Sequence, residues 1–319
     1  MSSFEVDTAM TINSLSSWTS DSMCRYHHTS LNFCVGLVHD NCLLFESSEF
    51  SLARGNIAGL VGTNGAGKTS LAKVIASREL PGFPPDLTLE YISAHEDSLF
   101  TSEHTSSLTP SMYLQSVCAS RLCSLQNEID MLESSLENIS SESVEIFANQ
   151  IAERLELQEK IEAETKTSID RIVEELGLAP HMHKPITHLS CGWRYKCRLA
   201  AAFVVHTDLL IIDEPSFLDA ASLNWLSAQV LQAKANDAMV LIISHKESFM
   251  DQLCERIIYI NSCNQTLSCY NCGYGAFRDI HLNEVSLAER ACSEYRDKVK
   301  DTDKMVKNIQ TQLDRRERN

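Results

Sequence analysis

The chain has 319 residues, of which 44% are hydrophobic, and its formal net charge is −16. This length and apolar content are ample for the buried core of one large or two modest domains. The acidic balance argues against a non-specific nucleic-acid binder, because such binding depends on basic side chains and the sequence has no long basic run.

The N-terminal segment, residues 1–30, is rich in Ser and Thr and predicts a flexible lead-in. It lacks the basic and apolar regions of a secretory signal, so we expect a cytoplasmic protein whose 12 cysteines are free thiols. The longest apolar stretches, residues 199–205 and 209–212, are too short to cross a bilayer, and no membrane span is expected.

The next part of the chain alternates strand-like and helical patterns. Short apolar runs bounded by turn residues predict strands at 31–38, 57–61 and 87–92, and a helical pattern covers 69–77. Residues 111–177 contain no proline, and no glycine before Gly177. Their apolar side chains recur at helical spacing, which predicts two or more helices with a hairpin turn near 140–143. This insertion is either a helical subdomain with a solvated acidic face or a projecting arm that contacts a partner.

After Gly177 the pattern returns to alternating strands and helices. Apolar runs of strand length lie at 209–212 and 240–244, and a helical pattern over 221–235 separates them. Such alternation predicts a parallel sheet covered by helices. The tail, residues 283–319, has no glycine or proline and places apolar residues on one side of a predicted long helix.

A glycine-rich loop lies between the strand at 57–61 and the helix at 69–77. Its pattern fits a phosphate-binding P-loop and runs through Gly62, Thr63, Asn64, Gly65, Ala66, Gly67, Lys68 and Thr69, with Ser70 next. Glycines let the main-chain amides wrap closely around phosphates, and the helix N-terminus adds its dipole. Lys68 would reach the β- and γ-phosphates, the Thr69 hydroxyl would bind Mg²⁺, and Ser70 would reach the α-phosphate.

A second acidic motif ends the strand at 209–212. Asp213 and Glu214 follow the apolar run and form a Walker B pattern at the ligand edge of the predicted sheet. Asp213 would hold Mg²⁺ through a water, and Glu214 would act as general base toward the water that attacks the γ-phosphate. Many strands end in Asp, so this motif is specific only in combination with the P-loop upstream.

Three further motifs point to one family. Leu189-Ser190-Cys191-Gly192-Trp193 resembles the LSGGQ signature of ATP-binding cassette (ABC) ATPases, Asp219 resembles their D-loop aspartate, and His245 resembles their switch histidine. The resemblance covers residues 31–274. It implies an α/β P-loop cassette with a mixed-sheet core, an antiparallel β subdomain and an inserted helical subdomain. It also implies ATP and Mg²⁺ as cofactors, and hydrolysis by Glu214, His245 and Lys68.

Details of the signature indicate a subfamily. Trp193 and the residues after it resemble the signature of the ABC-F group, and the tail resembles the charged linker between the two cassettes of an ABC-F protein. The expected division is a flexible segment (1–30), an ATP-binding domain (31–280, with its insertion at 111–177) and a helical linker (281–319). The resemblance implies pairing with a second cassette, in a homodimer or from another chain. Ser190, Gly192 and Asp219 would then meet ATP bound across the interface, and a ribosome-associated role in translation would follow.

Several departures from the family keep alternatives open. Cys191 replaces the first signature glycine, and Ala94-His95-Glu96 stands where the Q-loop glutamine is usual. A non-catalytic or degenerate ATP-binding regulatory module is therefore one alternative, and the nucleotide-binding subunit of a transporter is another. Two groups are compatible with a metal site. They are His181, His183, His188 and Cys191, and the Cys269-x-x-Cys272 pair with Cys263 nearby.

Overall fold

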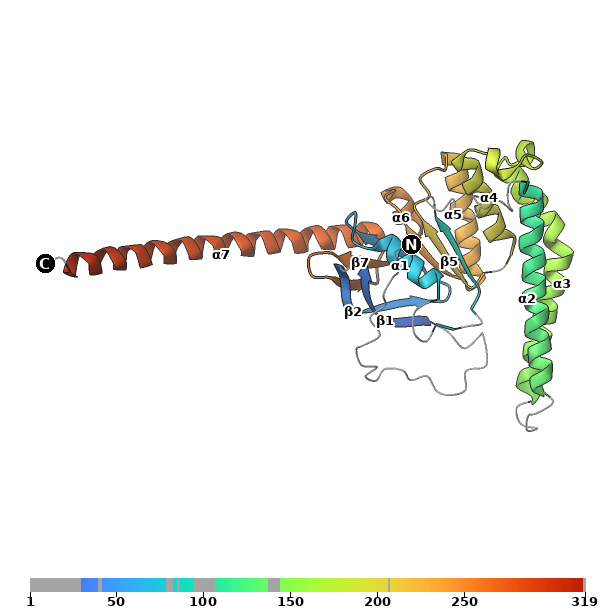
Figure 1. Ribbon diagram of the computed structural model, residues 1–319, viewed down its shortest axis with the longest axis horizontal. Helices are drawn as coiled ribbons and strands as arrows, with labels where there is room; N and C mark the ends of the chain where they lie inside the picture. The colour runs from blue at the N-terminus through green and yellow to red at the C-terminus, as the bar shows by residue number, and fades with distance from the viewer. Residues whose placement is uncertain are drawn as a thin grey trace.

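The fold is known from a computed structural model, which describes residues 30–39, 42–78, 83–84, 87–93, 107–136, 144–205 and 207–317. Three sequence expectations lie outside these ranges: the flexible segment before residue 30, the Ala94-His95-Glu96 segment and the turn near 140–143. A helical arm and a long single helix extend from opposite sides of an α/β core (Figure 1). Within the described ranges, no helix combines the length and apolarity that a membrane crossing requires.

The core is a six-stranded mixed sheet in the order β4-β5-β6-β3-β7-β8. The strands are β3 (Ile57–Gly62), β4 (Leu89–Ser93), β5 (Leu209–Asp213), β6 (Met239–Ile243), β7 (Arg256–Asn261) and β8 (Thr266–Tyr270). The first five run parallel, and β8 pairs antiparallel with β7. Every residue of β5 and β6 is buried, as expected for parallel strands with helices on both faces.

Strand side chains alternate between two apolar clusters, one on each face of the sheet. Leu209 and Ile211 of β5 join the cluster that contains Leu71 and Ile75 of α1 (Lys68–Ala76). Leu210 joins the opposite cluster, with side chains from α4 (Cys191–Val204), α5 (Ala220–Ala235) and α6 (Glu247–Leu253). The period of two in the strands therefore places α1 on one face and α4, α5 and α6 on the other.

A two-stranded antiparallel sheet accompanies this core. It consists of β1 (Ser30–His39) and β2 (Cys42–Ala53), paired from Ser30 opposite Ala53 to His39 opposite Cys42. Leu31, Phe50 and Leu52 are buried in the same apolar cluster as α1. The predicted combination of a mixed sheet with an antiparallel β part is confirmed.

The helical arm consists of α2 (Pro110–Leu136) and α3 (Val144–Glu175), drawn in green in Figure 1. At the root of the arm, Leu114 of α2 and Ile172 of α3 pack with Cys197 and Ala200 of α4. Two short 3-10 helices, η4 (Ala179–His181) and η5 (Ile186–His188), then lead from the arm to α4. The inserted helices are thus seated on the helix that begins in the signature motif.

The long helix α7 (Tyr274–Glu317) has 44 residues and extends away from the core (Figure 1). It begins before the predicted start near residue 283, because its first turn packs into the core. Phe277 is buried, and its ring lies 5.6 Å from the Tyr259 ring of β7 and 5.0 Å from the Tyr270 ring of β8. The helix from residue 287 to residue 307 is exposed.

Candidate nucleotide-binding site

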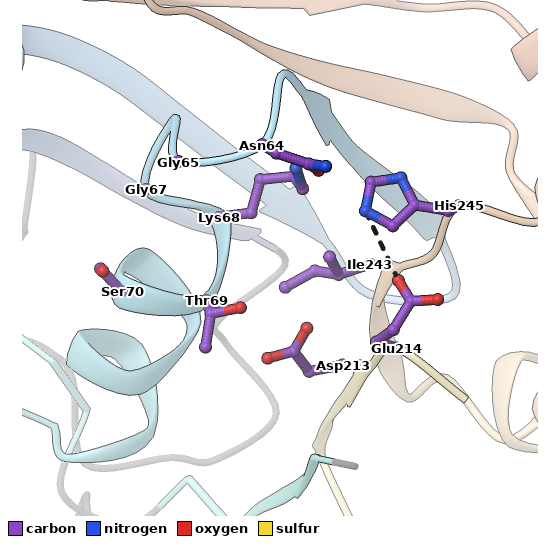
Figure 2. Close-up of a pocket in the computed structure, with 10 residues that line it drawn as sticks. All are labelled: Asn64, Gly65, Gly67, Lys68, Thr69, Ser70, Asp213, Glu214, Ile243 and His245. Atoms are coloured by element: carbon purple, nitrogen blue, oxygen red, sulfur yellow. Dashed lines mark ion pairs between the residues drawn. The ribbon is translucent and has the colours of Figure 1, made fainter. Parts of the chain in front are cut away.

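One pocket of about 380 Å³ lies at the carboxyl ends of β3, β5 and β6, where α1 begins. Parallel strands present their ligand-binding loops at this edge of an α/β sheet. Figure 2 shows the residues that line the pocket, which are Asn64, Gly65, Gly67, Lys68, Thr69, Ser70, Asp213, Glu214, Ile243 and His245. The structure therefore brings the predicted P-loop, Walker B and histidine motifs together in one place.

The backbone of the P-loop depends on two glycines in left-handed conformations. Gly65 has a φ of 80° and Gly67 a φ of 96°, values that other residues rarely adopt. Gly67 is the N-cap of α1, so the helix begins at Lys68 with its first amide groups directed into the loop. This arrangement offers main-chain donors and the positive end of a helix dipole to an anion.

Lys68 lies across the mouth of this loop. Its Nζ atom donates to the carbonyl oxygens of Gly62, at 2.8 Å, and of Thr63, at 3.0 Å. Burial lowers the pKa of Lys68 from its ordinary value, while the negative charges of Glu214 and Asp213 act in the opposite direction. The ammonium group is thus held over the loop by acceptors that an anionic phosphate could replace.

Asp213 is the last residue of β5 and is only 1% exposed. One of its carboxylate oxygens, Oδ2, accepts a hydrogen bond of 3.0 Å from the Tyr91 hydroxyl of β4. Thr69, in the first turn of α1, lies beside Asp213 in Figure 2, whereas Ser70 points away from the two acids. A hydroxyl and a carboxylate are oxygen ligands of the kind that Mg²⁺ prefers, so the residues present fit this metal.

Glu214 follows β5 in a strained backbone conformation. Its φ of 52° is in the left-handed region, and its main-chain amide donates to the carbonyl of Ile243 at 2.8 Å. A non-glycine residue in this region costs on the order of 1–3 kcal/mol, and such positions cluster at functional sites. The Oε2 atom of Glu214 lies 3.9 Å from Nε2 of His245, which follows β6 (Figure 2).

The signature residues and Asp219 lie outside this pocket. Ser190 is the exposed N-cap of α4, and Gly192 lies beside the main-chain oxygen of Phe217. Asp219 caps α5 by accepting a hydrogen bond from the Ser222 amide at 2.8 Å, and it also accepts one from Lys196 of α4 at 3.2 Å. These bonds, the one from Ser222 above all, lower the pKa of Asp219 to about 2.

The two groups of possible metal ligands do not line the pocket described above. Among the residues that the structure describes, no three His, Cys, Asp or Glu side chains are arranged to hold a metal ion. His181 instead packs on the Trp193 ring, with the ring centroids 4.3 Å apart, next to the ammonium group of Lys196. In the described part of the chain, neither these histidines nor the Cys269-x-x-Cys272 pair belongs to a group of three or more potential metal ligands.

Sequence reasoning did not identify Tyr91 as part of this region. The signal that could have found it is its position, two residues before the carboxyl end of β4. That strand runs parallel to β5, with Tyr91 opposite Ile211 and Ser93 opposite Asp213. Side chains two residues apart share a face of a strand, so Tyr91 reaches diagonally to Asp213.

A profile of the ABC transporter family matches residues 45–217, which is more than half of the chain. The chain therefore belongs to the ABC transporter family. Among curated relatives, it is 31% identical over 246 residues to the ATP-binding cassette sub-family F member 3 of Pongo abelii, covering 74% of this chain and 31% of that protein. It is 26% identical over 223 residues to Elongation factor 3 of Gonapodya prolifera, covering 69% of this chain and 16% of that protein.

The solved structures bear on the fold alone. An ATP binding subunit of an ABC transporter superimposes with a TM-score of 0.52 at 18% identity, covering 76% of this chain and 90% of that one. The predicted cassette fold and the predicted likeness to ABC-F proteins are confirmed. The chain spans between 16% and 31% of the length of the two curated relatives named above.

Proposed function

We propose that this chain binds ATP with Mg²⁺ in the pocket between β3, β5 and β6 and hydrolyses it. The observation that carries the proposal is the convergence of Lys68, Thr69, Asp213, Glu214 and His245 on one pocket from separate elements. Lys68 and the loop amides would hold the phosphates, and Thr69 and Asp213 would hold Mg²⁺. Bound Mg²⁺ neutralises charge on the phosphates during phosphoryl transfer.

Glu214 and His245, which lie opposite the phosphate loop, would position and activate the attacking water. Glu214, held toward the pocket by its left-handed backbone, would accept a proton from the attacking water. His245 lies beside Glu214 and would hold Glu214 and the terminal phosphate in position relative to one another (Figure 2).

We further propose that the site is completed by a second cassette. Ser190, Gly192 and Asp219 do not line the pocket, although family resemblance assigns them to nucleotide contacts. Ser190 is exposed at the N-terminus of α4, a helix of 14 residues whose positive end suits an anionic phosphate. These features support a pair in which each signature meets ATP on the other cassette, from a second copy or another chain.

A role in translation, in the cytoplasm and at the ribosome, is the broader part of the proposal. It is supported by the relatives, one of which is named an elongation factor and another an ABC-F member. The division into an ATP-binding domain (31–280) and a linker (281–319) is proposed because Phe277 is buried against the core, whereas α7 is exposed from residue 287 to residue 307. Because the chain spans less than a third of each of these relatives, their whole activity is not carried over.

One observation favours a second candidate, a non-catalytic ATP-binding module. Cys191 is exposed at the first position of α4, and its Sγ atom accepts a contact of 3.4 Å from Nη2 of Arg194. A side chain therefore stands where the family signature has a glycine, next to the place where a partner's phosphate would approach. This would weaken closure of the pair without affecting the chain's own phosphate loop.

The test is ATP hydrolysis by the purified chain over a series of protein concentrations, with Glu214→Gln and Lys68→Ala variants on a sizing column with ATP and Mg²⁺. Turnover that rises faster than linearly, and a Glu214→Gln dimer that forms only with ATP, would support hydrolysis by a cassette pair. The matched Lys68→Ala variant should form no such dimer. Tight ATP binding with neither turnover nor dimer would favour the non-catalytic module.

A further inference from the structure

The Asp213 carboxylate has a hydrogen-bond donor on the neighbouring strand β4. Asp213 is 1% exposed, and a buried carboxylate needs hydrogen-bond donors in place of water. The Tyr91 hydroxyl supplies one, at 3.0 Å from Oδ2. Since this bond occupies one oxygen from the side of β4, it restricts the rotation of the carboxylate and leaves the other oxygen for a ligand.

Tyr91 is in turn held by a buried arginine. Arg198 of α4 is 6% exposed, and its Nη2 and Nη1 atoms donate to the main-chain oxygens of Tyr91 and Ser93, each at 3.0 Å. These two carbonyls lie on the same side of β4, which is the edge strand of the sheet. In the described part of the chain no strand lies beyond β4, so the guanidinium fork pairs carbonyls on its outer side and fixes the end of β4 against α4.

We propose that Tyr91 is a positioning residue for Mg²⁺ binding, and that Arg198 holds it in place. The hydroxyl of Tyr91 orients Asp213, and Arg198 connects that bond to α4, the helix that begins in the signature motif. The chain Arg198–Tyr91–Asp213 therefore links the surface offered to a second cassette with the Mg²⁺ ligand of the chain's own pocket. This inference rests on the proposed binding of ATP with Mg²⁺.

The structure also provides a matched control for Tyr91. Tyr195 of α4 is 3% exposed, and its hydroxyl has no hydrogen-bond partner among the described residues. Tyr195→Phe removes the same atom as Tyr91→Phe from a buried tyrosine in the same part of the protein. The two variants differ in that only Tyr91→Phe deletes a bond to Asp213.

The experiment is a titration of a fluorescent ATP analogue with the full chain, first in EDTA and then over a series of Mg²⁺ concentrations. Tyr91→Phe should raise the Mg²⁺ concentration for half-maximal enhancement of binding by about tenfold, since a hydrogen bond to a charged group contributes this much. Its affinity in EDTA should match that of the wild type, and Tyr195→Phe should match the wild type under both conditions.

The arginine provides a second readout. Arg198→Ala should shift the Mg²⁺ dependence in the same direction as Tyr91→Phe, and Arg198→Lys should shift it less. The double variant, Tyr91→Phe with Arg198→Lys, should shift it no more than Tyr91→Phe alone. Equal Mg²⁺ dependence of Tyr91→Phe and the wild type would overturn the inference and leave ATP binding standing. Wild-type binding that does not respond to Mg²⁺ would overturn the proposed function itself.

Discussion

Nε2 of His245 lies 3.9 Å from Oε2 of Glu214, so two side chains that follow adjacent strands lie beside one another, opposite the P-loop (Figure 2). The histidine side chain is 59% exposed and the glutamate 19%, which places His245 at the rim and Glu214 deeper. A group at the rim can contact both the terminal phosphate and the glutamate, and this position motivates the first prediction.

His245→Ala should lower the rate of ATP turnover by roughly 100-fold, the lower end of what one positioned polar group contributes. Nucleotide affinity should stay unchanged, because the P-loop carries the phosphate contacts. Steady-state phosphate release and fluorescent-nucleotide binding measure the two quantities. His188→Ala, which removes an exposed histidine outside the pocket, is the control. An equal loss in both variants would show that His245 has no special part in turnover.

Asp219→Ala should lower the free energy of unfolding by about 1 kcal/mol, because the α5 cap to the Ser222 amide is lost. Asp219→Asn should cost less, since asparagine also caps helices and forfeits only the ion pair with Lys196. Urea unfolding of both variants makes the comparison. If Asn proves as costly as Ala, the ion pair and not the cap provides the stability.

Glu90→Gln should flatten the pH dependence of stability. Burial raises the pKa of Glu90, with Arg198 acting in the opposite direction. The folded state then holds this proton more tightly than the unfolded state, so its contribution to stability is present at low pH and is lost as pH rises above about 4.5. Glutamine stays neutral, so the variant should lose less stability than the wild type toward neutral pH.

Unfolding by urea at a series of pH values checks this expectation. Glu133→Gln removes one carboxylate from an exposed position of α2 and serves as the control for the change in net charge. If both variants flatten the profile equally, the effect comes from total charge, and burial of Glu90 has no part in it.

Arg154→Met should loosen the helical arm without altering the pocket. The Arg154 side chain of α3 is 8% exposed, and its Nε atom lies 3.2 Å from Oε2 of Glu128 in α2. The variant deletes this link between α3 and α2 and leaves Glu128 with the longer contact of 3.6 Å to Arg121 of the same helix. Amide hydrogen exchange should therefore accelerate in α2 and α3, while Mg²⁺-dependent nucleotide binding stays the same. Lys166→Met, at an exposed position of α3, should change neither.

The P-loop and the strands beside it could be predicted because their signals are local. Glycines at 62, 65 and 67 and an apolar run before them specify a strand, a loop and a helix without reference to the rest of the chain. The strands β2, β7 and β8 were not predicted. Strand formation depends on partners, and β7 pairs with β3, about 200 residues away, as the Gly59–Ile257 register shows.

The candidate site, too, could be predicted only where its sequence signals are local. Each predicted pocket residue came from a motif with its own sequence pattern, whereas the Tyr91–Asp213 bond joins residues separated by 122 positions. That bond requires a particular register between β4 and β5, and a one-residue slip would turn Tyr91 to the opposite face. The register of parallel strands is set by packing of the whole sheet, so no local sequence pattern predicts this contact.

The ring contacts at the start of α7 set the direction of the whole helix and so the position of its far end. At a rise of 1.5 Å per residue, 44 residues extend over about 66 Å, so a tilt of about 10° at the base displaces the far end by about 11 Å. The tilt is set where Phe277 and His281 pack on Tyr259, on the strand next to the one that carries the phosphate loop. A small shift of these side chains, which leaves the core intact, would therefore move the far end of α7 by about the diameter of a helix.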